Sequence, residues 1–272
     1  MVDRTAPAPA QAGRRLPRLR RGGVPAAILA WIALWWLIAA GFGISKDFLP
    51  TPGDVFLRLV RLSTEPTGAG TLIVHVLASL ERFALGFAMA MGIGVPLGFL
   101  MGYFRPVDRI VSPVFEVLRP IPPIAWAPFA ILWFGASIGS QAFVILLSAL
   151  PPIVINAYLA LKLTDRRLID AARVMGAGPR IILLEVALPA AVPLVFTGLR
   201  IGLAMGWMSL IAAEIVAGDG SNSGLGYLIL LGQRTLHADL SIAAMVVIGV
   251  IGALLDIGLG RLNGRFQRWK VE

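Results

Sequence analysis

The sequence predicts an all-α fold that crosses a membrane several times, and two observations lead to this prediction. The 272 residues are 57% hydrophobic and only 14% charged, with a mean hydropathy of +0.82, whereas soluble domains are roughly 45–50% apolar. Several apolar stretches also reach the roughly 20 residues that a helix needs to cross a hydrocarbon core about 30 Å thick. We therefore expect a polytopic membrane protein.

The chain begins with a basic segment, residues 1–24, that is rich in Arg, Pro and Ala and predicts a disordered cytoplasmic tail. The first apolar stretch follows at 25–44. A secretory signal is the alternative here, but the stretch exceeds the usual length of about 7–15 residues. Because further spans follow it, we expect an uncleaved anchor, and we assign residues 25–272 to one transmembrane domain.

Five more stretches bring the expected number of membrane-spanning helices to six. They lie at 76–101, 121–134, 141–161, 190–216 and 240–260. The stretch at 121–134 is short and is interrupted by prolines, which break helices. We expect a broken helix there, extended by the segment that begins near Val111.

The distribution of basic residues predicts the orientation of these helices. Of the 24 Lys and Arg residues, 17 lie in the tail, in 103–110, in 162–187 and in 261–272; four lie on the opposite side, and three lie within or beside spans. Lys and Arg are retained on the cytoplasmic side of membrane proteins. We therefore expect a multi-pass membrane protein with both termini in the cytoplasm.

The longest cytoplasmic loop, 162–187, has the pattern of a folded segment. Thr164 and Asp165 can cap a short helix. Four small or apolar residues recur in it at i, i+3, i+4 and i+7, which forms one face of a helix. They are Leu168, Ala171, Ala172 and Met175. Gly176 can end this helix in a left-handed conformation, and Pro179 can begin a second short helix.

The same loop resembles the signature of the permeases of binding-protein-dependent ABC importers. The family pattern is Glu-Ala-Ala, three residues, Gly, nine residues and Ile-x-Leu-Pro. The corresponding residues here are Asp170, Ala171, Ala172, Gly176, Val186, Leu188 and Pro189. The spacing matches throughout, while Asp replaces Glu and Val replaces Ile.

This resemblance implies a type I ABC importer permease fold and a coupling helix that fits a groove on an ATPase subunit. The expected docking residues are Leu168, Asp170, Ala171, Ala172, Met175 and Gly176. An amphipathic helix that lies against lipid headgroups is the alternative. The resemblance also implies two facing permeases in a homodimer in the bacterial inner membrane, a pair of ATPases and a periplasmic or lipid-anchored substrate-binding protein.

Two further motifs resemble the subfamily that imports aliphatic sulfonates, taurine, nitrate or bicarbonate. They are Leu118-Arg119-Pro120-Ile121-Pro122-Pro123 before Trp126, and Ala212-Ala213-Glu214 before Ser223-Gly224-Leu225-Gly226-Tyr227. The resemblance covers about 49–270. It implies a small anionic substrate, and we expect taurine or an aliphatic sulfonate, with nitrate or bicarbonate as the alternative.

Three residues of the fifth span lie on one helical face, because Arg200, Trp207 and Glu214 are spaced by seven. Intramembrane charges are costly and usually face water or protein. We predict that this face lines the translocation pathway; ion pairs with neighbouring spans, such as one with Arg82, are the alternative. A separate strip of Gly198, Gly202 and Gly206 predicts tight helix packing.

An enzyme does not fit this sequence. There is no cysteine and no Gly-rich phosphate loop, so no metal site, cofactor or nucleic-acid partner is expected. ATP and Mg²⁺ would bind the partner ATPase. We expect His75 and His237, which lie outside the predicted spans, to be solvated in loops. A gradient-driven carrier would have no need for the Ala-Ala-Gly loop. A scaffold protein is a third possibility, and it would differ in that mutation of Gly176 or Ala172 leaves uptake unaffected.

Overall fold

The computed structural model describes residues 23–41, 45, 47–217 and 223–266, and this part of the chain is helical without a strand. The predicted tail, residues 1–24, falls almost entirely outside it. In chain order, the elements are α1 (Gly23–Gly41), α2 (Pro52–Thr64), α3 (Leu72–Tyr103), α4 (Arg105–Leu118), η1 (Pro123–Trp126), α5 (Ala127–Phe134), α6 (Ile138–Lys162), α7 (Arg166–Val174), α8 (Pro179–Ile181), η2 (Ile182–Ala187), α9 (Leu188–Val216), α10 (Leu225–Arg234) and α11 (Ala238–Phe266).

Four helices of the described chain are long and apolar enough to cross a membrane. They cover Leu72–Tyr103, Ile138–Lys162, Pro179–Val216 and Ala238–Arg265. The predicted break in the third span is confirmed, because α4 and the η1–α5 segment are bent by 88° relative to each other. If that pair counts as one span the total is five, and α1, with its apolar part at Ala26–Gly41, is shorter than the other spans.

Two boundaries differ from the sequence-based expectation. The third span begins at Arg105 rather than near Val111, because Pro106 lies in the first turn of α4, where its missing N–H costs no hydrogen bond. The second short helix that Pro179 begins is not separate. It continues through the π-helical turn η2 into α9, so that Pro179–Val216 is one helix of 38 residues.

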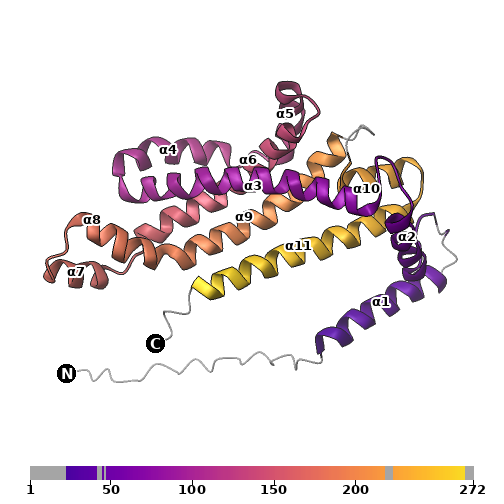
Figure 1. The fold of residues 1–272 in the computed structure, drawn as a ribbon, viewed down its shortest axis with the longest axis horizontal. Coiled ribbons are helices and arrows are strands. Elements are labelled where there is room, and N and C mark those ends of the chain that lie inside the picture. Colours follow the sequence, from indigo (N-terminus) through magenta and orange to yellow (C-terminus); the bar gives the residue numbers. More distant parts are fainter. Residues whose placement is uncertain (1–22, 42–44, 46, 218–222, 267–272) are drawn as a thin grey trace, which may run out of the picture.

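Helix α6 lies between α3 and α9, and glycines bring the three helices close together (Figure 1). A Cβ atom on Gly98 would lie 2.5 Å from the carbonyl oxygen of Val154, and one on Gly198 would lie 2.5 Å from the Cβ of Asn156. Neither position can hold a larger side chain without a shift of the helix. The small-residue strip predicted on the fifth span is therefore confirmed as a packing surface, and Gly98 makes an equally close contact on the second span.

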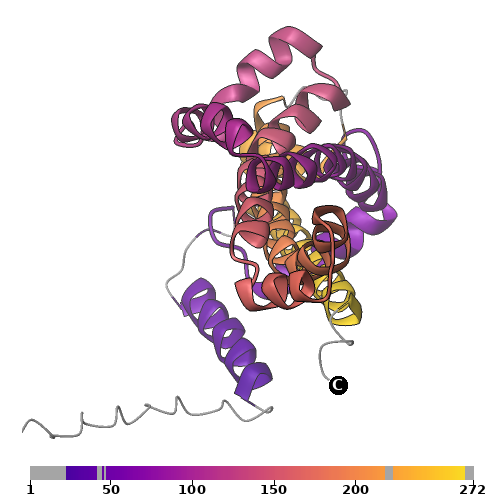
Figure 2. The ribbon, with the colours of Figure 1, turned by 90° about the vertical axis from the view of Figure 1, so that its left-hand side faces the viewer.

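The largest buried cluster lies at the end of the bundle where α2 and α10 meet the long helices. It includes Leu62, Phe83, Trp207, Leu228 and Leu240. Trp35 of α1 packs against this cluster and Ala39 is also buried, while most of the helix lies away from the bundle, as Figure 2 shows. Trp31 is 73% exposed. In a membrane, this helix faces lipid or another subunit.

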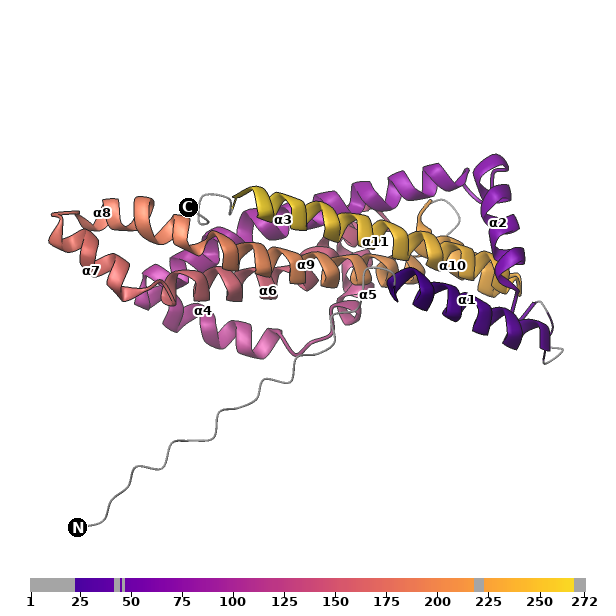
Figure 3. The same cartoon turned by 90° about the horizontal axis from the view of Figure 1, so that it is seen from below.

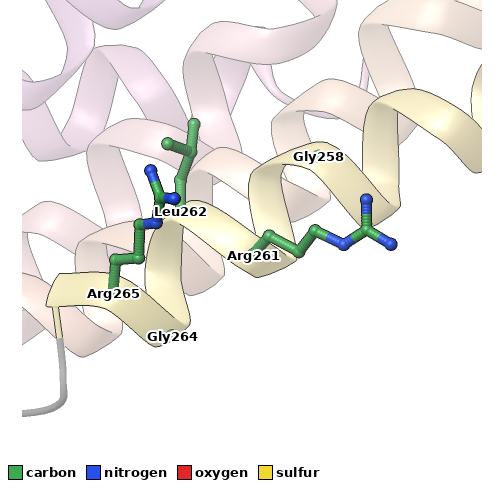
Figure 4. A pocket seen from close by; sticks show the side chains of 5 residues that line it. All are labelled: Gly258, Arg261, Leu262, Gly264 and Arg265. Carbon is green, nitrogen blue, oxygen red and sulfur yellow. The ribbon is translucent and has the colours of Figure 1, made fainter.

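The beginning of α1 and the end of α11 both point toward the end of the molecule that carries α7 (Figures 1 and 3). Both ends of the described chain therefore lie on the side of the basic loop 162–187. That this side is cytoplasmic stays a prediction. At the end of α11, Arg261 and Arg265 flank a surface hollow of about 470 Å³ that residues of this helix alone line (Figure 4). Arginines at such a position extend toward headgroups.

Candidate coupling loop and intramembrane polar groups

Helix α7 is held at both ends by local hydrogen bonds. The side chain of Asp165 accepts a hydrogen bond of 2.9 Å from the backbone N–H of Arg167, which confirms Asp165 as the N-terminal cap. At the other end, Gly176 has a φ of +85°. The N–H of Gly176 donates to Arg173 and the N–H of Ala177 donates to Ala172, which is a Schellman motif. The predicted left-handed glycine is therefore confirmed.

The structure corrects the face that α7 presents. Helix α7 packs against η2, and Ala172 lies in this contact with 5% of its surface exposed. We predicted that Ala171 and Ala172 both face a partner, but only Ala171 is exposed. Helical periodicity assigns both alanines to the same face of α7. It does not show that the loop folds back on itself, which is why the burial of one alanine was not predicted.

The exposed side of α7 combines apolar and charged groups. Leu168 is 51% exposed and Met175 is 81% exposed. Asp170 is also exposed and pairs with Arg173 on the next turn at 3.3 Å. Exposed apolar side chains that lie together at the tip of the molecule are typical of a contact with another protein.

Glu214 lies in a buried polar network rather than beside a passage. Its Oε1 accepts hydrogen bonds from Arg82 at 2.8 Å and from Ser79 at 2.7 Å, and its Oε2 accepts one from the backbone N–H of Gly226 at 2.8 Å. The side chains of Arg82 and Glu214 are 6% and 1% exposed. For this residue the structure shows the ion pair that we considered as the alternative.

His75 lies beside this network. The prediction that His75 is solvated in a loop is wrong. Helix α3 begins at Leu72, so His75 lies in its first turn and is fully buried. Its Nδ1 accepts a hydrogen bond from the N–H of Gly224, and its Nε2 lies 2.9 Å from the carbonyl oxygen of Thr67. These partners place the proton on Nε2. His237 is exposed, as predicted.

The other two residues of the predicted pathway face also contact α11. Arg200 pairs with Asp256 through two nitrogen atoms. Trp207 is 5% exposed, and its indole N–H donates to the carbonyl oxygen of Ile248 at 3.2 Å. Trp207 and Glu214 therefore do not border an open passage in this subunit. Arg200 remains more than half exposed, so a role for it in transport stays a prediction.

The described residues contain no cluster of three or more side chains that could hold a metal ion. The fold forms structural ion pairs on one face of α9. Separately, it presents the capped helix α7 at one end of the molecule. Comparison with known proteins identifies the family of the chain. Residues 94–270 match the family of binding-protein-dependent transport system inner membrane components.

The chain belongs to this family. Over 243 residues the permease is 36% identical to the taurine transport system permease protein of Escherichia coli, covering 89% of this chain and 87% of that protein. It is 33% identical over 245 residues to a nitrate import permease protein of Synechocystis, covering 88% and 86%.

A solved structure also shares the fold of this permease. A chain of the MetNI methionine ABC transporter in an inward-facing conformation matches with a TM-score of 0.61 and 23% identity, over 72% of this chain and 96% of that one. At this identity the likeness concerns the fold alone. The type I permease fold expected from the sequence is thereby confirmed.

Proposed function

We propose that this permease moves a small anion, taurine or an aliphatic sulfonate, into the cytoplasm as half of a homodimer in the inner membrane. A separate pair of ATPase subunits hydrolyses ATP with Mg²⁺, and a soluble binding protein delivers the substrate. Membrane lipid surrounds the remaining faces. Family membership gives the transport class, and the similarity to a taurine permease supports the substrate.

The observation that carries the energy-coupling part of the proposal is the position of α7. The helix is capped at both ends, protrudes from the bundle and connects through the turn at Gly176 to the 38-residue helix that contains η2 and α9. An ATPase that binds α7 through Ala171, Leu168 and Met175 would thus act on a membrane-spanning helix directly. Asp170 contributes the polar edge of this docking surface, and Gly176 forms the turn that ends α7.

A second substrate class has its own support. The similarity to a nitrate import permease is nearly as high as the similarity to the taurine permease. Nitrate or bicarbonate is therefore the alternative substrate. A gradient-driven carrier is the alternative mechanism, and it predicts uptake into vesicles that contain no ATP.

The test is to purify the permease with its associated subunits and to compare two leucine substitutions. Ala171→Leu places a larger side chain on the exposed surface of α7, while Ala40→Leu makes the same change at an exposed position of α1. We expect Ala171→Leu to release the ATPase subunit and Ala40→Leu to retain it. Equal retention in both variants, or uptake without ATP, would contradict the proposal.

A further inference from the structure

A cavity of about 760 Å³ lies between the broken third span and the middle of α6 and α9. Its volume is within the usual range of about 300–1,000 Å³ for small-molecule sites. Trp126, Trp133 and Phe143 contribute aromatic rings to its wall. Its lining comes from the end of α4, the η1–α5 segment, α6 and α9, and the arm that contains α5 projects from the long helices (Figure 1).

Three polar side chains interrupt this apolar wall. Ser209 on α9 donates a hydrogen bond of 2.7 Å to Ser148 on α6, which in turn donates to the backbone of α9. The third is Arg119, which lies at the C-terminal end of α4. Among the residues that the structure describes, no ion pair or side-chain hydrogen bond includes Arg119.

Arg119 is exposed in the described subunit and directly follows α4, the first half of the broken third span. Arg119 lines the same cavity as Ser148 and Pro151, which are near the middle of α6. Ionisable residues within spans usually pair with one another or face a water-filled path or a ligand. Irregular backbone, such as the turn between α4 and η1, is tolerated at membrane depth where it borders a cavity or is covered by protein. Arg119, which is unpaired among the described residues, and the irregular turn between α4 and η1 both indicate an aqueous site.

We propose that this cavity is the subunit's binding site for the transported oxyanion, and that Arg119 binds the sulfonate or nitrate oxygens. A guanidinium group offers paired N–H donors that match an oxyanion. The hydroxyls of Ser148 and Ser209 can rotate to donate as well. The α9 residues that face the anion are then Met205 and Ser209, not the face with Arg200. The inference rests on the proposed function, because it concerns the substrate of the same transporter.

Cysteine labelling tests the site without relying on transport. The chain contains no cysteine, so Ser209→Cys can be labelled in the assembled transporter with an anionic and a cationic methanethiosulfonate reagent. Ala204→Cys, an exposed position of α9 outside the cavity lining, is the control. We expect the anionic reagent to modify Ser209→Cys at least about ten-fold faster than the control, because Arg119 attracts it.

Addition of Arg119→Gln should lower the ratio of anionic to cationic labelling at Ser209→Cys, again by about ten-fold. Taurine or nitrate should slow labelling only while Arg119 is present. A Ser209→Cys that reacts no faster than the control, or a ratio that Arg119→Gln leaves unchanged, would overturn the proposal. Arg109→Gln removes the same charge from an exposed position of α4 and should leave the ratio unchanged.

Uptake into proteoliposomes separates this inference from the proposed function. We expect Arg119→Gln to reduce ATP-dependent uptake of labelled taurine or nitrate at least about ten-fold and Arg119→Lys to restore part of it, because a positive charge remains. If the unaltered transporter imports neither anion, the proposed substrate class is wrong. If it imports one and Arg119→Gln imports it equally well, the cavity proposal alone is wrong.

Discussion

Arg82 on α3 and Glu214 on α9 form an ion pair of 2.8 Å, and almost no part of either side chain reaches solvent. The carboxylate also accepts a hydrogen bond from the first turn of α10. Three helices are thereby joined at a single carboxylate. A helix N-terminus favours a negative charge beside its free N–H groups, so Glu214 serves α10 in place of a capping residue.

Substitution of Glu214 by Gln should destabilise the permease strongly. Arg82 would lose its charged partner in a buried environment, and breaking a buried pair costs about 3–5 kcal/mol. Asp239→Asn is the control, because its pair with Arg58 is 3.6 Å long and partly exposed, and such pairs contribute about 0–1 kcal/mol. Thermal unfolding in detergent measures both, and similar losses for the two variants would contradict this interpretation.

Gly98→Ala should weaken the contact between α3 and α6. The added methyl group would lie 2.5 Å from a backbone oxygen of α6, and overpacking of this kind costs about 1–3 kcal/mol. Gly92 lies on the same helix, and a methyl group added there would meet no atom within 4 Å. Gly92→Ala should therefore be neutral or stabilise the helix by up to about 1 kcal/mol. A reversed order of the two melting temperatures would refute the packing argument.

Ala172→Leu should disturb the loop itself rather than its outer surface. Ala172 is a buried residue of α7, and α7 packs against η2, so we expect a larger side chain to push the two elements apart. We expect faster proteolysis within 162–187 for Ala172→Leu and an unchanged rate for Ala171→Leu, which adds volume on the exposed side. Equal protection of both variants would mean that the internal contact is absent in solution.

Tyr158→Phe should reduce the amount of solute imported per ATP hydrolysed. The Tyr158 hydroxyl on α6 donates 3.0 Å to Asp108 on α4 and also contacts Lys162, four residues before α7 begins. These contacts join the loop 162–187 to α4, and α4 ends at the cavity that Arg119 lines. Tyr103→Phe removes an exposed hydroxyl at the end of α3 and should leave the ratio unchanged. Unaltered coupling in Tyr158→Phe would exclude this connection.

Much of the fold could be predicted because its determinants are local. Apolar length predicts the long helices, the prolines after Leu118 predict the break in the third span, and the single glycine at 176 predicts the turn after α7. Each of these features depends on residues that are neighbours in the sequence. The family signature lies in one such segment, which is why the transport class could be predicted from the loop alone.

The contacts between distant segments could not be predicted in the same way. Arg82, the partner of Glu214, lies 132 residues away in the sequence. The helical periodicity of α9 does not show whether Glu214 forms an ion pair or lines a pathway. The sequence favours a loop at His75 because a histidine weakens the apolar pattern, although its buried partners make it part of α3. Burial of Ala172 likewise depends on a turn of the chain that helical periodicity does not describe.

The uninterrupted helix from Pro179 to Val216 has a mechanical consequence. With a rise of about 1.5 Å per residue, its 38 residues form a rod roughly 57 Å long, well beyond the hydrocarbon thickness of about 30 Å. A tilt of about 10° would displace one end of such a rod by roughly 10 Å relative to the other. Small rotations imposed on the loop thus become large movements on the far side of the membrane, and the π-helical turn is the place where the rod can yield.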